Sequence, residues 1–235
     1  MKISVITEKE KNIFKSGYPM IVPFLVTEYY DGLEIEVYSG VKSFSKKLVK
    51  RYGKEIFSDE ALTILTDELE KYADLHGYEG EKHERLRWYH SFSMRSAENL
   101  DTSAILPSSV KIEEDVCINR TTLEVGENLE KNIPMFATIA DGQIVSMACV
   151  NEYSEGQRML EITVETSPAY RKKGYARSNT AALAKYLIEN GYSVAYCCSR
   201  YNIGSERIAR SLGFDYVGRF YAYNAYKKNY YKTTA

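Results

Sequence analysis

Apolar and polar residues alternate with two different periods along the first part of the chain. Between residues 33 and 37 apolar side chains alternate with glutamates, which predicts a half-buried strand. The preceding Asp31-Gly32 pair is typical of a tight hairpin turn and predicts a partner strand before it. After Ser58, leucines recur at helical spacing until Gly77, so this segment is expected to be an amphipathic helix.

The pattern becomes sharper after Pro134. It predicts the following elements: a hairpin of strands 135–140 and 143–150 around Asp141-Gly142, a strand at 159–166, a helix at 175–189, a strand at 194–198, a helix at 203–212, and two final strands at 214–217 and 220–226. This order predicts an α/β (α+β) fold with a mixed, mostly antiparallel central sheet flanked by helices. Weak patterning between residues 110 and 134 predicts a boundary between an additional N-terminal α+β domain, residues 1–125, and a second domain, residues 126–235.

Composition limits the classes of function. The net charge of -1 and the pI near 6.4 give no general attraction to nucleic acid or to an anionic membrane, so neither is expected as a partner. The first apolar run is too short for a signal peptide, and the four cysteines have neither zinc-site spacing nor a CxxC pair. We therefore expect a cytoplasmic protein without a metal site.

The segment between the predicted strand at 159–166 and the following helix carries the clearest chemistry. Arg171, Lys172 and Lys173 precede Gly174, and the helix begins immediately afterwards. Unpaired N–H groups in the first turn of a helix favour a bound phosphate, and a glycine lets the phosphate approach the backbone. The segment contains neither GxxxxGK[ST] nor GxGxxG, so it is not one of those two phosphate-binding loops.

This segment resembles the acyl-CoA loop of the GCN5-related N-acetyltransferase (GNAT) superfamily, in which Arg or Gln is followed by two residues, Gly, one residue, and Gly or Ala. Arg171, Gly174 and Ala176 occupy those positions. Asn202, Ser205 and the run that ends in Leu-Gly-Phe at residues 212–214 are similar to the second motif of the family. The resemblance covers roughly residues 134 to 226, in the C-terminal half.

The resemblance implies a GNAT-like fold and an acyltransferase, most simply an N-acetyltransferase that moves the acetyl group of acetyl-CoA, as co-substrate, to a small-molecule or peptide amine by direct attack on the thioester. It also implies a coenzyme site made of the following residues: Val164, Glu165, Thr166, Arg171, Lys172, Lys173, Gly174, Tyr175, Ala176, Arg177, Asn202, Ser205 and Arg207. Arg210 is a further candidate for the adenosine 3′-phosphate.

The catalytic residues are less constrained by the motif. Glu165 is the first candidate for the general base and Glu161 the second, because both belong to the polar face of the strand at 159–166. Many family members have a tyrosine four residues before the glycine of the second motif, but this chain has Ala209 there. Tyr221 is therefore our candidate proton donor, with Tyr223 or Tyr216 as alternatives. The alternative function is a catalytically silent acyl-CoA-binding or regulatory module. Two further hypotheses are that residues 1–125 shape the acceptor site and that the protein forms a homodimer.

Overall fold

The chain folds into two compact units in a computed structural model that describes residues 2–5, 19–29, 32–81, 86–112, 134–150 and 158–228. Unit 1 comprises Met1–His90, Ser199–Tyr201 and Val217–Ala235. Unit 2 comprises Ser91–Cys198 and Asn202–Tyr216. The boundary that we expected at 125/126 lies outside the described residues.

Unit 1 contains a sheet whose strands follow the order β1-β3-β2-β11. These are β1 (Lys2–Val5), β2 (Met20–Tyr29), β3 (Gly32–Val37) and β11 (Asp215–Lys227), with β4 (Tyr78–Gly80) paired to the end of β11. Strand β1 is parallel to β3, whereas β2 is antiparallel to both β3 and β11. Strands β2 and β3 form the predicted hairpin; Asp31 of its turn lies outside the described residues.

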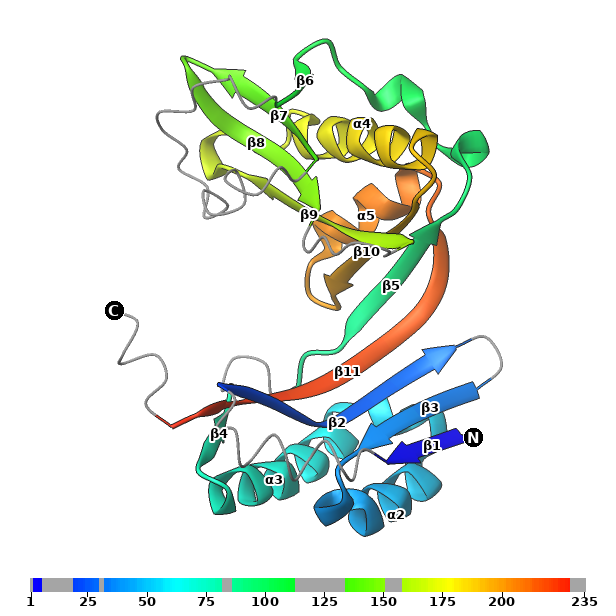
Figure 1. The fold of residues 1–235 in the computed structure, drawn as a ribbon, viewed down its shortest axis with the longest axis vertical. Coiled ribbons are helices and arrows are strands. Elements are labelled where there is room, and N and C mark those ends of the chain that lie inside the picture. The colour runs from blue at the N-terminus through cyan, green and yellow to red at the C-terminus, as the bar shows by residue number, and fades with distance from the viewer. Residues whose placement is uncertain are drawn as a thin grey trace. The chain divides into compact units, whose positions relative to one another are not determined.

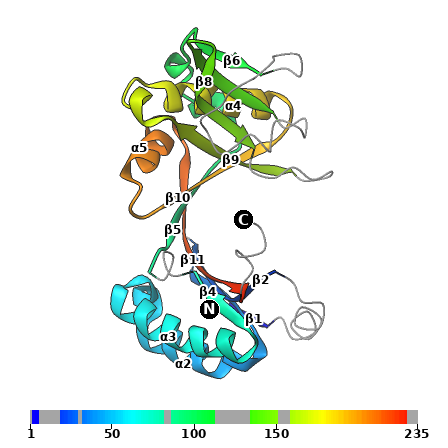
Figure 2. The same ribbon diagram turned by 90° about the vertical axis from the view of Figure 1, so that its left-hand side faces the viewer.

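Two helices cover one side of the unit 1 sheet, α2 (Lys42–Tyr52) and α3 (Asp59–Leu75), with the 3₁₀ turns Ser39–Val41 and Gly53–Phe57 before and between them (Figures 1 and 2). Helix α3 matches the prediction. Ser58 caps its N-terminus by accepting a hydrogen bond from the Ala61 N–H at 3.3 Å, and Leu62, Leu65 and Leu69 have no exposed surface. Helix α2 was missed, because it buries only Ser45, Leu48 and Val49 among many lysines.

In unit 2, neighbouring strands follow the order β10-β9-β8-β7-β6. Its strands are β6 (Ser109–Lys111), β7 (Met135–Ala140), β8 (Gln143–Val150), β9 (Met159–Thr166) and β10 (Ser193–Ser199). Neighbours are antiparallel except β9 and β10, which are parallel. Asp141 and Gly142 have φ of 51° and 72°, and these positive angles make the tight turn that the sequence predicted.

Two helices complete unit 2, α4 (Tyr175–Glu189) and α5 (Ile203–Ser211). Short 3₁₀ turns lie at Ala97–Asn99, Thr102–Ala104 and Pro168–Tyr170. Leu183, Leu187 and Ala209 are fully buried against Leu160 and Val194 of the sheet. The core of unit 2 therefore fixes both helices to the strands from which they emerge.

The C-terminal strand differs from the prediction. We expected two strands separated near Gly218, but β11 runs continuously from Asp215 to Lys227. A Cβ atom at Gly218 would lie 1.8 Å from the Glu28 carbonyl oxygen, so this glycine allows a close approach of β2 rather than ending the strand. Strands β5 (Tyr89–Met94), β10 and β11 each have residues in both units. The mixed, mostly antiparallel sheet structure with flanking helices is confirmed.

Candidate functional site

The N-terminus of α4 has the backbone geometry of an anion site. Gly174 caps the helix with a left-handed φ of 83°, and Lys172 also has a positive φ, 63°. The first helical hydrogen bond runs from the Ser178 N–H to the Gly174 carbonyl at 2.9 Å. The N–H groups of residues 175–177 precede this bond and have no acceptor within the helix, so they are oriented for an external anion.

A cleft with a volume of about 570 Å³ opens at this helix start. Its basic side chains, Arg171, Lys172 and Arg177, outnumber the single carboxylate, Glu165. The complete lining is Val164, Glu165, Thr166, Tyr170, Arg171, Lys172, Gly174, Tyr175, Ala176, Arg177, Asn202, Gly204, Ser205 and Ile208. The volume and the positive lining suit a phosphorylated ligand with an apolar arm.

Strands β9 and β10 separate beside the cleft. Their parallel pairing extends from Met159–Ser193 only to Glu161–Ala195, although β9 continues to Thr166 and β10 to Ser199. On its other side β9 stays paired with β8 as far as Thr166. The edge of β9 that faces β10 therefore has backbone groups beyond Glu161 that an extended ligand can pair with, as another strand would.

The two arginines of the loop use their side chains within the protein. Arg171 donates from Nε to the Thr166 carbonyl at 3.1 Å, which folds the loop back on the end of β9. Arg177 binds the Asp101 carboxylate and also donates to the Ser211 hydroxyl, with its Nε at 3.0 Å from Oγ. Both arginines line the cleft, and both also hold its wall in place.

Helix α5 forms another part of the lining. Asn202 caps α5, because its Oδ1 accepts a hydrogen bond from the Ser205 N–H at 3.1 Å. The roles of cap and cleft residue are thus combined at Asn202. Sequence reasoning did not select Tyr170, Gly204 or Ile208, which resemble ordinary loop and helix residues and are brought to the cleft only by the fold.

Three basic residues expected at the coenzyme lie elsewhere. Lys173 does not line the cleft, and its Nζ lies over the Tyr170 ring, 4.8 Å from the centroid. Arg207 is exposed outside the lining. Arg210 stacks on Phe92 and on Tyr216, with its guanidinium carbon 5.3 Å from each ring centroid. The structure does not bring Lys173, Arg207 or Arg210 into the cleft.

The two candidate carboxylates have different surroundings. Glu165 is half-buried in the cleft wall. Glu161 does not line the cleft. Its carboxylate acts on Cys197 instead: burial, and then the charge of Glu161, raise the pKa of the Cys197 thiol to about 12. The geometry therefore favours Glu165 as the carboxylate that a ligand in the cleft would meet.

The tyrosines selected as proton donors do not line the cleft. Tyr221 has no exposed surface and packs in the hydrophobic core of unit 1 against Phe24, with ring centroids 6.4 Å apart. Tyr223 is buried in the same core, and Tyr216 packs on Phe92. Sequence reasoning missed Tyr196, a buried residue of β10 whose pKa is raised by burial to about 12.

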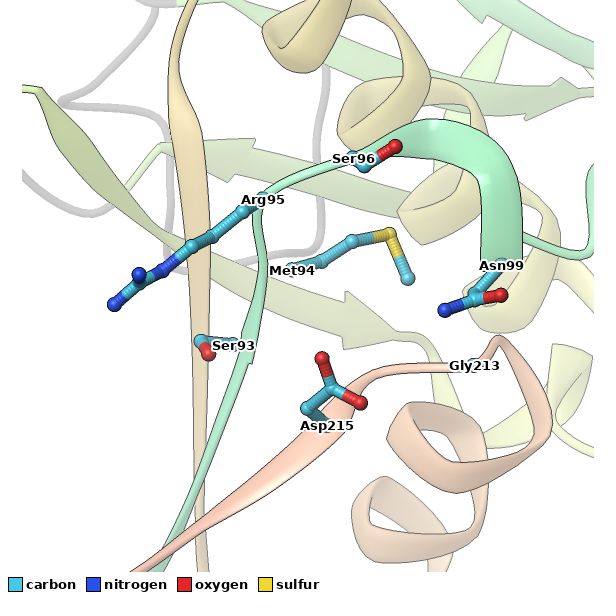
Figure 3. Close-up of a pocket in the computed structure, with 7 residues that line it drawn as sticks. All are labelled: Ser93, Met94, Arg95, Ser96, Asn99, Gly213 and Asp215. Atoms are coloured by element: carbon cyan, nitrogen blue, oxygen red, sulfur yellow. The ribbon is translucent and has the colours of Figure 1, made fainter.

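A second, smaller pocket of about 310 Å³ in unit 2 shares no lining residue with the cleft. Figure 3 shows the Asp215 carboxylate and the Asn99 amide pointing toward the same space, while Arg95 extends away from it. The full lining is Ser93, Met94, Arg95, Ser96, Asn99, Gly213 and Asp215. Among the described residues, no group of three or more His, Cys, Asp or Glu side chains could hold a metal ion. Within the same residues no helix has the length and apolar character needed to cross a membrane.

The family model for GNAT acetyltransferases matches residues 27–223. The chain therefore belongs to the GNAT acetyltransferase family. The resemblance that we placed over roughly residues 134–226 was too short, because the match begins within β2 and includes most of unit 1. None of the curated proteins compared matches the chain.

Several solved structures match the chain at low sequence identity. A GNAT-family protein from Novosphingobium aromaticivorans is 19% identical, with a TM-score of 0.48 over 60% of this chain and 65% of that chain. The chain thus spans just under two thirds of that relative. A GCN5-related N-acetyltransferase-like protein from Streptococcus suis is 15% identical, with a TM-score of 0.46 over 92% of both chains. An aminoglycoside N-acetyltransferase, AAC(6′)-Iy, in complex with CoA is 23% identical, with a TM-score of 0.32 over 39% of this chain and 75% of that chain.

Proposed function

We propose that this protein is an N-acetyltransferase that binds acetyl-CoA in the cleft between β9 and the start of α4 and acetylates a small-molecule or peptide amine. The cleft itself carries the proposal. It joins the separated edge of β9 to a helix N-terminus with a positive lining, and these two features suit the pantetheine arm and the pyrophosphate of one ligand. A cytoplasmic location, without nucleic-acid or membrane partners, remains part of the proposal.

The residues at each end of the cleft have distinct tasks. Backbone N–H groups of residues 175–177, together with Arg171 and Lys172, hold the pyrophosphate. The backbone of Val164 and Thr166 orients the pantetheine arm. The bound coenzyme supplies an activated acyl thioester, and the protein must provide an acceptor amine in its neutral form.

Glu165 is the proposed general base. Its side chain belongs to the cleft wall, so it is the described carboxylate placed to take a proton from an amine, directly or through water. Replacing it by Gln keeps the shape and removes the base. General-base catalysis typically contributes about 10²- to 10⁴-fold, so we expect Glu165→Gln to lower kcat by at least about 10²-fold with little change in the affinity for CoA.

Calorimetry with CoA and thiol release from acetyl-CoA in the presence of an amine panel test the function. Affinity with amine-dependent thiol release supports the transferase. Affinity without release would support the silent binding module, and no affinity for CoA would reject the proposal. Glu161→Gln is the matched control on the same strand; if it loses more activity than Glu165→Gln, the role of base belongs to Glu161.

A further inference from the structure

A network of hydrogen-bonded polar side chains, all buried except the partly exposed Ser109, joins the two walls of the cleft. It runs from Ser178 on α4 through Ser109 and Asn179 to Ser146 on β8, and ends at the Glu165 carbonyl on β9. Ser146, Ser178 and Asn179 have no exposed surface. Burial of polar groups is unfavourable unless they are hydrogen-bonded, so the arrangement requires every member to be in place.

Near α4, each hydrogen bond of this network has only one possible donor. The Leu106 N–H donates to the Ser178 hydroxyl at 2.7 Å, and the Ser109 hydroxyl donates to Asn179 Oδ1 at 2.5 Å. Ser109 has one hydroxyl proton and has used it, so Ser178 must be the donor in the 2.5 Å contact between their two hydroxyl oxygens. Thr138 adds a second donor to Asn179 Oδ1, at 3.3 Å.

Near β9, the hydrogen-bonding capacity of the Ser146 hydroxyl is fully occupied as well. Asn179 donates from Nδ2 to the Ser146 hydroxyl at 3.3 Å, and Ser146 donates to the Glu165 carbonyl at 3.3 Å. The Thr166 hydroxyl, 2.7 Å from that of Ser146, must then donate to it. Ser146 thus uses its one donor and both acceptor positions, and it is bound to two consecutive residues of the cleft wall.

We propose that Ser146 and Asn179 are positioning residues that set the spacing between β9 and the N-terminus of α4, so that one coenzyme molecule can occupy both at once. The inference rests on the proposed function. The network is attached to α4 at Ser178, the residue that forms the first helical hydrogen bond with Gly174, and to β9 at Glu165 and Thr166. A ligand that spans two walls gains the affinity of both only when their separation matches its length.

The test compares CoA with 3′-phospho-ADP, the part of CoA that lacks the pantetheine arm. Calorimetry measures the Kd of each ligand for the intact wild-type protein and for Ser146→Ala and Asn179→Ala. We expect CoA to bind at least about tenfold more weakly to both variants, while the Kd of 3′-phospho-ADP changes by less than about twofold, because the shorter ligand contacts only the helix end.

Thr180→Val is the matched control. Thr180 follows Asn179 on α4 and is equally buried, but its hydroxyl has no hydrogen-bond partner among the described residues. This variant is expected to leave both Kd values unchanged. Ser146→Ala removes a single oxygen and decides the question if Asn179→Ala does not fold.

The outcomes separate the two proposals. Equal weakening of both ligands in the folded variants would show a general structural role and overturn the positioning inference, as would an unchanged Kd for CoA. A wild-type protein that binds neither ligand would instead reject the proposed function. Weaker binding of CoA alone, with the control unchanged, supports the inference.

Discussion

Arg177 of α4 binds the carboxylate of Asp101, a residue of the segment between two 3₁₀ turns that lies 76 positions earlier in the chain. Arg177 also donates to the hydroxyl and the carbonyl oxygen of Ser211 at the end of α5. The Asp101 N–H in turn donates to the Leu212 carbonyl at 3.2 Å. One guanidinium therefore connects three segments of unit 2 beside the candidate cleft.

This contact predicts a stability that depends on pH. The Ser103 hydroxyl and then the Arg177 guanidinium lower the pKa of Asp101 from its ordinary value of 3.8, against the opposing effect of burial. A carboxyl with a lowered pKa in the folded state stabilises the protein above the pKa of its unfolded form and loses this effect as the pH falls through the folded pKa. Asp101→Asn should therefore lower Tm at pH 7, and this difference should shrink as the pH falls from 3.8 through the lower pKa of the folded state.

Thermal unfolding of both proteins between pH 3 and pH 7 checks this expectation. Ser103→Ala, which removes the group with the largest influence on Asp101, should reproduce part of the change with the same pH dependence. A Tm difference that is constant over the whole pH range would show that the Asp101 charge is not responsible.

Gly174 predicts a change in coenzyme affinity. In Gly174→Ala the new Cβ meets nothing closer than Leu106 Cδ1 at 4.0 Å, so the cost comes from the left-handed φ, about 1 to 2 kcal/mol. Relaxing that strain moves the helix start, and we expect the Kd for CoA to rise about tenfold. Gly191→Ala is the control, since Gly191 has a φ of 86° at the other end of α4 with open space around it. Calorimetry should find a similar loss of stability in both variants but weaker CoA binding only in Gly174→Ala; equal CoA binding would contradict the prediction.

The sequence predicted the elements of the fold where the pattern was local and strong. The bounds of β9 and α4 agree with the prediction, because alternation of apolar residues and a long helical stripe depend only on neighbouring positions. Helix α2 was missed because its buried face is narrow, and β11 was divided in error at Gly218. That glycine is required by the approach of β2, a tertiary contact that no local pattern reveals.

In the candidate site, too, local features could be predicted from the sequence, whereas features that depend on tertiary contacts could not. The loop from Arg171 to Ala176 could be selected from its residue types, because a basic segment with a glycine at a helix start is a local signal. The proton donor could not, since burial in a core decides whether a tyrosine such as Tyr221 can reach a ligand. The network through Asn179 joins residues about 70 positions apart and likewise has no sequence signature.

The described cysteines should react slowly in the folded protein. Burial and the Glu165 carboxylate raise the pKa of Cys149 to about 11, and burial with the Glu206 carboxylate raises that of Cys198 to about 11, from an ordinary 9.0. With the pKa of Cys197 at about 12, each thiolate at pH 8 is at least about 100-fold scarcer than in the unfolded chain.

Mass spectrometry after brief iodoacetamide treatment tests this in Cys117→Ser, which removes the cysteine outside the described residues. The native protein should stay unmodified at Cys149, Cys197 and Cys198, whereas the protein in denaturant should be labelled at all three. Rapid labelling of any of them in the native state would show that its thiol is more acidic or more accessible than the structure indicates.

At Gly213, which lies just beyond the end of α5, an added methyl group is expected to cause a large loss of stability. Its φ is 86°, and an added Cβ would lie 2.0 Å from the Asn99 carbonyl oxygen, which belongs to the backbone beside the pocket of Figure 3. Gly142→Ala is the matched control: Gly142 has a φ of 72° with nothing within 4 Å of the added atom, so that variant measures backbone strain alone, about 1 to 2 kcal/mol. Gly213→Ala must in addition push two backbone segments apart, and we expect it to cost at least about 2 kcal/mol more. Denaturant unfolding of the two variants gives the difference directly, and equal losses would mean that the backbone at Asn99 moves aside without cost.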